Sequence, residues 1–160
     1  MSDNKGRVCL WYDGGISQAA DFYCATFPET RRDQLLTAPG DNPSVHKGEE
    51  FTVTMTLVGI PVLLLNGGPH FKLNEAASFQ VETADQAETD RLWNAVTADG
   101  GAESQCGWCK DRWGLSWQII PRALTQGLTD PDRKVAARVQ EAMIKMKKID
   151  IAAIEAARHG

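Results

Sequence analysis

The pattern that most constrains the fold is an order of elements that occurs twice along the chain. In each half, the residues predict a strand, then a helix, and then two or three further strands. Residue identities do not repeat between the halves, so the duplication is inferred from element order alone. One βαβββ unit exposes an apolar sheet face, and a second unit can cover it. We therefore expect an α+β fold of two paired βαβββ modules that form a curved, barrel-like mixed sheet with a hollow for a ligand.

The individual elements follow from alternation, helical spacing and capping signals. Residues 51–57 alternate large apolar side chains with threonines, which predicts a strand with one buried face. Ser17 is the expected N-cap of the first helix, which ends at Phe27 because proline follows. Asp85, with Glu88 three residues later, predicts a capping box for a second helix that stops at Gly100. The remaining expected strands cover residues 8–12, 32–38, 62–66, 78–83, 103–110 and 115–120.

The chain changes character after Pro121. We expect one domain over residues 1–121, with modules at about 8–66 and 78–121, followed by a C-terminal helical extension over residues 122–160. The segment Asp130-Pro131 predicts the start of a helix. Its apolar stripe at helical spacing is formed by Val135, Val139, Met143 and Met146. This stripe needs an apolar surface, in its own domain or in a second copy of the chain. Because two-fold symmetry dominates soluble oligomers, we expect a homodimer.

Charge and hydropathy exclude two classes of partner. The 160 residues carry a net charge of −4 and contain no basic stripe, so we expect no nucleic-acid partner. The longest apolar run, residues 60–65, contains Pro61 and is too short to span a bilayer, so we expect no membrane partner. The first six residues lack an apolar signal region. These observations predict a cytoplasmic protein.

The four cysteines are expected to be free thiols. Cys9 lies in an apolar strand and Cys24 on an apolar helix face, which predicts small buried side chains. Cys106 and Cys109 have the spacing of a redox pair, but such a pair sits at a helix N-terminus. Here a strand is predicted, so one thiol is expected to face inward and the other outward.

Two glycine-punctuated, aromatic-rich segments predict a binding pocket. One is Asn66-Gly67-Gly68-Pro69-His70-Phe71, and the other covers residues 105–121, with three of the five tryptophans within ten positions. Concave sites combine apolar walls with a few aimed polar groups. Trp117 and Gln118 must face opposite sides of a strand, and we expect Gln118 to face the hollow. Neither segment contains a complete catalytic set, so no catalytic residue is assigned. The candidate ligand-binding residues are Trp11, Asn66, His70, Phe79, Gln105, Trp108 and Gln118.

Nearly the whole chain, from about Val8 to Ala157, resembles one known family. The matching segments are residues 10–13, 19–28, 66–76, 78–81, 105–108, 110–121 and 142–151. They resemble the PhnB-like branch of the glyoxalase/bleomycin-resistance/extradiol-dioxygenase (vicinal oxygen chelate) superfamily. The family is often labelled 3-demethylubiquinone-9 3-methyltransferase, so the resemblance implies that label as well as the paired-module fold.

The residues do not support the metal or the cofactor that this resemblance implies. Metal enzymes of the superfamily place His, Glu or Gln ligands on the first and last strands of each half. Here the first strand of the second half offers Ser78 and Gln80, and Gln118 on its last strand falls where relatives have a metal-binding Glu, but one neutral amide does not make a metal site. A methyltransferase must hold a large charged cofactor, and no strand, glycine-rich loop and helix with a following acidic residue are present. We therefore expect neither a metal nor a cofactor.

Three functions stay open from the sequence. The first is a protein that binds a small, partly apolar molecule without a metal. The second is an enzyme of unknown reaction in the same fold, either of the metal-dependent lyase, isomerase or dioxygenase type or using His70 and Gln118 for proton handling or orientation. The third is the methyltransferase label taken literally. The sequence favours the first.

Overall fold

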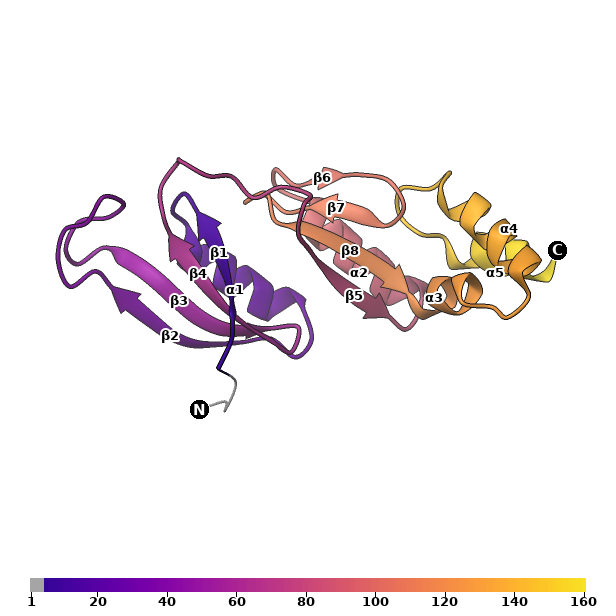
Figure 1. Cartoon of the computed structure of the whole chain (residues 1–160), viewed down its shortest axis with the longest axis horizontal. Helices are drawn as coiled ribbons and strands as arrows, with labels where there is room; N and C mark the ends of the chain where they lie inside the picture. Colours follow the sequence, from indigo (N-terminus) through magenta and orange to yellow (C-terminus); the bar gives the residue numbers. More distant parts are fainter. Residues whose placement is uncertain (1–4) are drawn as a thin grey trace. The chain divides into compact units, whose positions relative to one another are not determined.

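The computed structural model describes residues 5–160, which form two compact units, one up to Leu73 and one from Asn74 to the end (Figure 1). The first contains β1 (Val8–Tyr12), α1 (Ile16–Thr26), β2 (Arg31–Thr37), β3 (Glu50–Leu57) and β4 (Ile60–Asn66). The second contains β5 (Ser78–Thr83), α2 (Gln86–Thr97), β6 (Ala102–Glu103), β7 (Trp108–Lys110), β8 (Ser116–Pro121), α3 (Arg122–Leu128), α4 (Arg133–Met143) and α5 (Ile151–His159).

Each unit contains one four-stranded mixed sheet of the same topology. The strand orders are β1-β4-β3-β2 and β5-β8-β7-β6. In each sheet the first strand pairs in parallel with the last strand of its unit, and the other pairs are antiparallel. The predicted α+β class and the βαβββ order are therefore confirmed. The strands form two separate, unclosed sheets.

The first unit buries one face of its sheet against α1. The alternation predicted for residues 51–57 is confirmed, because Val53, Met55 and Leu57 are almost fully buried while the intervening threonines are half-buried. Across the core, the hydroxyl groups of Tyr12 and Tyr23 lie 3.0 Å apart. The opposite face of the sheet carries no helix of this unit, and we call it the open face (Figure 1).

The first helix begins two residues earlier than predicted. Its N-cap is Gly15, in the left-handed conformation at φ 68°, and not Ser17. The Ser17 hydroxyl instead donates to Glu50 at 2.5 Å and accepts from Arg32 at 3.1 Å. The sequence signal was misleading because a serine near a helix start can bond to neighbouring strands as well as to its own helix.

The second unit buries the matching face of its sheet against α2. Phe79, Val81, Trp117 and Ile119 point to this face, and Leu92 of the helix is fully buried. The predicted cap is confirmed, since Asp85 Oδ1 accepts from the Glu88 N–H at 2.8 Å. The Glu88 carboxylate in turn accepts from Ala84 N–H.

The predicted strand over residues 103–110 is wrong. It is divided into β6 and β7 by a turn in which Cys106 and Gly107 have positive φ angles of 58° and 82°. The Cys106 N–H donates to Met146 O at 2.8 Å, and the Gly107 N–H donates to Lys147 O at 2.7 Å. Backbone contacts about forty residues away therefore stabilise this turn, and no local pattern reveals them.

The C-terminal helices belong to the second compact unit and share one apolar core with its sheet. Ile120, Leu124, Val139, Ile149 and Ile154 form this core, and Leu128, Ala142, Met143 and Met146 pack against it. Two members of the predicted stripe, Met143 and Met146, thus lie at its edge. The predicted helix start at Pro131 is wrong by two residues, because Asp132 is the N-cap and accepts from Lys134 N–H. The division of the chain into a domain over 1–121 and an extension stays a prediction.

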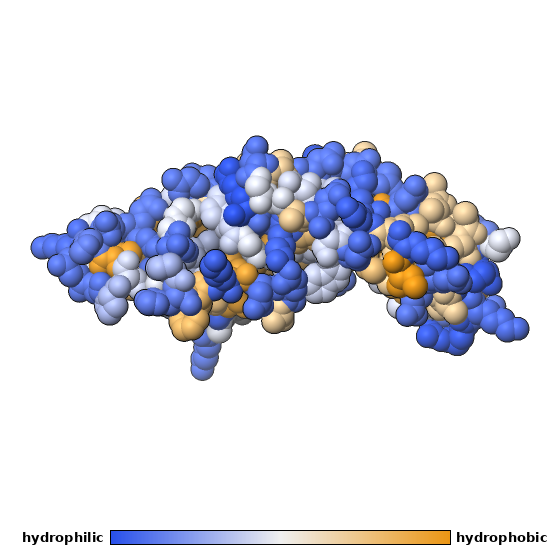
Figure 2. All heavy atoms as spheres, turned by 90° about the horizontal axis from the view of Figure 1, so that it is seen from above, coloured by the Kyte–Doolittle hydropathy of each residue, from blue (hydrophilic) through white to orange (hydrophobic). Residues whose placement is uncertain are grey.

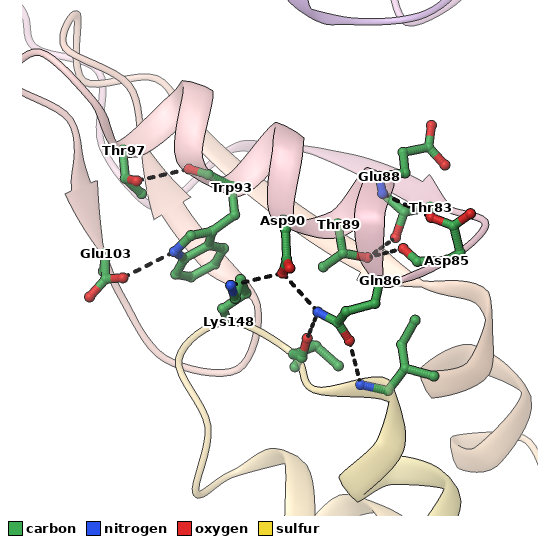
Figure 3. A network of polar contacts seen from close by, with 12 residues as sticks. Thr83, Asp85, Gln86, Glu88, Thr89, Asp90, Trp93, Thr97, Glu103 and Lys148 are labelled. Carbon is green, nitrogen blue, oxygen red and sulfur yellow. Dashed lines mark hydrogen bonds and ion pairs between the residues drawn. The ribbon is translucent and has the colours of Figure 1, made fainter.

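Helix α2 anchors the segment that precedes α5 (Figure 3). The Gln86 amide donates to Ile149 O at 3.1 Å and accepts from Ile151 N–H at 2.8 Å. The same amide donates to Asp90, which also pairs with Lys148 at 2.8 Å. The half-buried Gln86 side chain therefore bonds to two backbone groups at the start of the last helix, the Ile149 carbonyl and the Ile151 N–H.

The carboxylate of Glu103 adds a second anchor. It accepts from the Trp93 indole N–H at 3.0 Å and pairs with Lys147 at 3.3 Å (Figure 3 shows the indole contact). The indole hydrogen bond, followed by the Lys147 ammonium, lowers the pKa of Glu103 below its usual 4.5.

The surface and the cysteines complete the fold. On the face shown in Figure 2, hydrophilic residues predominate and hydrophobic ones form separate small patches. Cys9 is exposed and Cys24 half-buried, so their predicted burial is wrong. We predicted that one thiol of the Cys106/Cys109 pair faces inward and the other outward. Cys109 is buried, as expected for an inward thiol, but Cys106 is half-buried. Among the helices within residues 5–160, none is long and apolar enough to cross a bilayer.

Candidate functional site

The open face of the first sheet is built in rows, because strand register places residues of neighbouring strands side by side. One row is Trp11, Leu65, Thr52 and Leu36, and the next is Cys9, Leu63, Thr54 and Gln34. The third contains Pro61, Thr56 and Arg31, and Arg7 continues the alternation of β1 at its start. The face therefore changes from apolar and aromatic at one end to basic and hydroxyl-bearing at the other.

A hollow of about 990 Å³ lies over the basic end of this face. The polar side chains that line it are Arg7, Arg31, Asp33, Gln34, Thr54 and Thr56. Arg31 Nε pairs with Asp33 at 3.1 Å, and both side chains are exposed. None of these residues was selected from the sequence, because they come together only through the pairing of strands that are far apart along the chain.

Trp11 lies on the open face and anchors the first glycine-rich segment. Its indole N–H donates to Gly68 O at 2.8 Å, and its ring meets the Phe71 ring edge-on at 4.9 Å. A Cβ atom at Gly67 would lie 2.2 Å from the indole, so only glycine fits beneath it. The tryptophan predicted to be a pocket wall is thus also the support of the 66–71 segment.

Asn66 and His70 of that segment have different positions. The Asn66 amide accepts from Gly14 N–H and donates to Glu50 O, each at 3.0 Å. The amide oxygen therefore holds the turn after β1, and the amide nitrogen holds the start of β3. His70 lies exposed in the loop that follows β4. The two polar atoms of the Asn66 amide bond to Gly14 and Glu50, and neither bonds to His70.

The second sheet also has a face turned away from α2, which we call its open face, and it carries Gln118, the polar residue expected to face the hollow. Trp117 is fully buried on the helix-covered face, and Gln118 is half-buried on the open one. Gln118 Nε2 donates to Ser78 Oγ at 2.9 Å, because parallel pairing of β5 and β8 brings the two strands together. Trp108 pairs directly with Gln118 across β7 and β8 and is half-buried beside it.

Ser116 is the unusual member of this face. It is fully buried, and its Oγ atom has no hydrogen-bond partner in the part of the chain that the structure describes. Register places it between Ser78 and Lys110. Buried hydroxyl groups are normally paired, so an unpaired one indicates strain or a missing partner. The sequence gives no signal for it, since serine on a strand is ordinary.

A charged pair borders the same face. Lys110 forms an ion pair with Glu75, whose side chain is exposed. The hydrogen bond from Lys110 lowers the pKa of the Glu75 carboxyl, which favours its carboxylate form. Trp108, Lys110, Ser116 and Gln118 thus combine an aromatic wall, a cation, a hydroxyl and an amide on adjacent strands.

Phe79 and Gln105 lie away from this group. Phe79 is on the helix-covered face, with its ring 5.5 Å from that of Trp117. Gln105 is exposed in the turn between β6 and β7, and its carbonyl accepts from Trp108 N–H at 3.0 Å. Of the seven candidates, the structure brings Trp108 and Gln118 together and places Trp11 on the open face of the first unit.

Asp111 organises the hairpin between β7 and β8. Its Oδ1 atom accepts from the N–H groups of Trp113 and Leu115, and its Oδ2 atom accepts from the Trp117 indole, all at 3.0 Å. The Asp111 carboxylate is only 3% exposed. Burial, together with the charges of Asp111 and Glu103, raises the pKa of the neighbouring Cys109 thiol to about 12.

The residues at the superfamily's metal positions do not fit a divalent cation. Within residues 5–160, no three His, Cys, Asp or Glu side chains are arranged to hold a metal ion. Around the middle of the four parallel-paired strands, the open-face positions hold Cys9, Trp11, leucines, Ser78, Gln80, Ser116 and Gln118, and the carboxylate on this face of β5, Glu82, lies at the strand end and pairs with Arg122. Apart from Glu82, these groups are neutral at neutral pH or apolar, whereas oxygen-seeking cations need several carboxylates or imidazoles.

The comparisons with known proteins agree with this architecture. A family model described as 3-demethylubiquinone-9 3-methyltransferase matches residues 4–120. No curated protein matches the chain. The PhnB protein from Bacillus cereus is a similar solved structure, with 22% identity and a TM-score of 0.64 over 74% of this chain and 99% of that one.

Two further solved structures are similar in fold. A protein from Pseudomonas aeruginosa has 18% identity and a TM-score of 0.59 over 74% of this chain and 98% of its own. The fosfomycin resistance protein FosX from Listeria monocytogenes has 13% identity and a TM-score of 0.55 over 81% and 99%. At these identities the likeness shows the fold alone. The family model covers most of the chain, and we conclude that the chain belongs to the 3-demethylubiquinone-9 3-methyltransferase family, the PhnB-like branch of the glyoxalase/bleomycin-resistance/extradiol-dioxygenase superfamily.

Proposed function

We propose that the chain is a small-molecule-binding protein that uses no catalytic metal, with Gln118 and Ser116 as polar contacts and Trp108 as an apolar wall. The single observation that supports this most is the unpaired, fully buried hydroxyl of Ser116 beside the Gln118–Ser78 hydrogen bond. A buried hydroxyl without a partner costs about 1–3 kcal/mol, and a polar ligand group that displaces the atoms covering Ser116 would remove that cost.

The surrounding groups support a ligand of mixed character. The indole of Trp108 offers an apolar surface, and the Gln118 amide offers both a donor and an acceptor. The donor set supports the metal-free part of the proposal, because the carboxylates at this face, Glu75 and Glu82, are already paired with Lys110 and Arg122. The family label does not identify a reaction on this face.

Thermal-shift screening of a metabolite set against the full chain, with and without EDTA, tests this proposal. We expect at least one ligand to raise the melting temperature equally in both conditions. Ser116→Ala should leave the free protein as stable as before, or slightly more stable, and should weaken that ligand. Gln118→Ala should weaken it too. Gln140→Ala, an exposed amide on α4, is the matched control and should change nothing.

Two results would contradict the proposal. One is stabilisation that occurs only with a divalent cation and disappears with EDTA. The other is unchanged ligand affinity in both the Ser116→Ala and Gln118→Ala variants, since those side chains would then make no contact with the ligand.

We also propose that the protein is a cytoplasmic homodimer. Support for the dimer comes from the edge strand β2, where Leu35 and Leu36 are 36% and 47% exposed beside unpaired backbone groups. Light scattering after size exclusion should give twice the chain mass of 17.5 kDa. Leu36→Glu should shift the mass towards one chain. A single-chain mass for the unmodified protein would refute the dimer.

A further inference from the structure

We infer that the open face of the first sheet binds an organic anion, with the anionic group at Arg7 and Arg31 and an apolar body directed along the sheet. This inference goes beyond the proposed function, because it assigns a separate binding site on the first sheet and not the site around Gln118. It uses a hollow and side chains that lie wholly within the first compact unit.

The first step is the chemistry of the hollow. Two guanidinium groups, two threonine hydroxyls and one amide line it, and Asp33 is its only acidic side chain within the described residues. Guanidinium groups bind carboxylates and phosphates through two parallel N–H donors. Arg31 donates to Asp33 through Nε alone, which leaves its two Nη groups for another acceptor. Thr54 and Thr56 add hydroxyl donors on the neighbouring strand.

The second step is the direction of the ligand. Moving along the strands from the basic row, the register places Leu63 in the next row and then Leu65 beside Trp11. These leucines are half-buried, so part of each apolar surface is accessible. Because Trp11 is fixed by its bond to Gly68, its ring is a rigid end wall. A ligand with an anionic head and an apolar body of a few carbons matches this order.

The third step concerns the expected strength of anion binding and its dependence on salt. The Arg31 and Asp33 side chains are 68% and 43% exposed, so water screens the attraction and binding should weaken with salt. Asp33 neutralises part of the basic charge that faces the hollow. Removing its charge should therefore strengthen anion binding, whereas removing either arginine should weaken it.

Calorimetric titration of the full chain tests this with four probes of defined chemistry. They are octanoate, octyl phosphate, neutral octanamide and inorganic phosphate. Octanoate and octyl phosphate should bind more tightly than octanamide, which has the same body without charge. Tighter binding of octyl phosphate than of octanoate would identify phosphate as the preferred head group, and the reverse would identify carboxylate. Inorganic phosphate should bind more weakly than octyl phosphate, because it lacks the apolar body.

Single substitutions test whether each charged side chain strengthens or weakens anion binding. Arg31→Gln and Arg7→Gln should each weaken the better anionic probe by about fivefold at low salt, the size expected for one exposed charge-assisted contact. Asp33→Asn should tighten it by about twofold to threefold. Arg133→Gln, which removes the same charge from an exposed position on α4, is the control and should have no effect. These positions are exposed, so the variants should keep the melting temperature of the parent.

The possible failures are distinguishable. The anion inference is overturned if octanamide binds as tightly as octanoate, if no anionic probe binds, or if Asp33→Asn weakens the anion. In each of these cases the proposed function still stands when the metabolite screen finds a neutral ligand that depends on Gln118. It fails separately when the screen finds no ligand at all.

Discussion

Replacing Asp111 with alanine should destabilise the second compact unit by about 3–5 kcal/mol, because this buried carboxylate is the acceptor for three donors. Two of them, the Leu115 N–H and the Trp117 indole N–H, belong to fully buried residues. The third, the Trp113 N–H, belongs to a half-buried residue where water can replace the carboxylate.

The magnitude follows from these donors one by one. A buried donor left without an acceptor costs about 1–3 kcal/mol, and two such donors account for most of the effect. The Trp113 donor should contribute about 0.5–1 kcal/mol, as an ordinary exchangeable bond does. Asp111→Asn keeps one acceptor oxygen but turns an amide donor towards an indole donor, so a loss of about 1–3 kcal/mol is expected.

Urea denaturation monitored by tryptophan fluorescence measures these losses. Four of the five tryptophans, at positions 93, 108, 113 and 117, lie in the second unit, so the signal reports mainly on that unit. Asp13→Ala is the control, since Asp13 lies exposed in the turn after β1; its effect should stay below about 0.5 kcal/mol. A loss below about 1 kcal/mol for Asp111→Ala would refute the reasoning, because two buried N–H donors without an acceptor should lower the free energy of unfolding by more than that.

Three further outcomes follow from the structure. Gly67→Ala should cost about 1–3 kcal/mol in urea denaturation, because its Cβ would lie 2.2 Å from the Trp11 ring. In the native protein at pH 8, Cys109 should react with a thiol reagent at least about tenfold more slowly than exposed Cys9, since burial raises its pKa to about 12; equal rates would contradict this. The lowered pKa of Glu103 means that its stabilisation is complete above pH 4.5 and is lost as the pH falls below that value, so Glu103→Gln should flatten this acid loss in thermal melts.

Local patterns predicted most of the fold. The alternation of residues 51–57 and the Asp85 cap depend on neighbours within a few positions, and both are confirmed. The βαβββ order followed from such local signals, and the family resemblance supplied the way that the strands pair. The turn at Cys106 was missed because its stabilising partners, Met146 and Lys147, are distant in sequence.

The sequence could predict the candidate site only where the alternation of side chains along a single strand fixes which face a residue lies on. Trp117 and Gln118 are adjacent on one strand, so their opposite orientation follows from the period of two. Phe79 lies on the face of Trp117 because of the β5–β8 register, which no single segment specifies. The unpaired hydroxyl of Ser116 likewise depends on what packs around it. Residues whose role is set by register and burial therefore stay invisible to pattern reasoning.

The most direct test of the central claim is a two-dimensional amide NMR spectrum of the full chain, titrated in EDTA with the best compound from the screen. The account predicts shifts in the Gln118 side-chain amide, the Trp108 indole N–H and the Ser116 backbone amide, without any divalent cation. Shifts confined to the helix-covered face around Phe79, or shifts that appear only when a divalent cation is added, would contradict it.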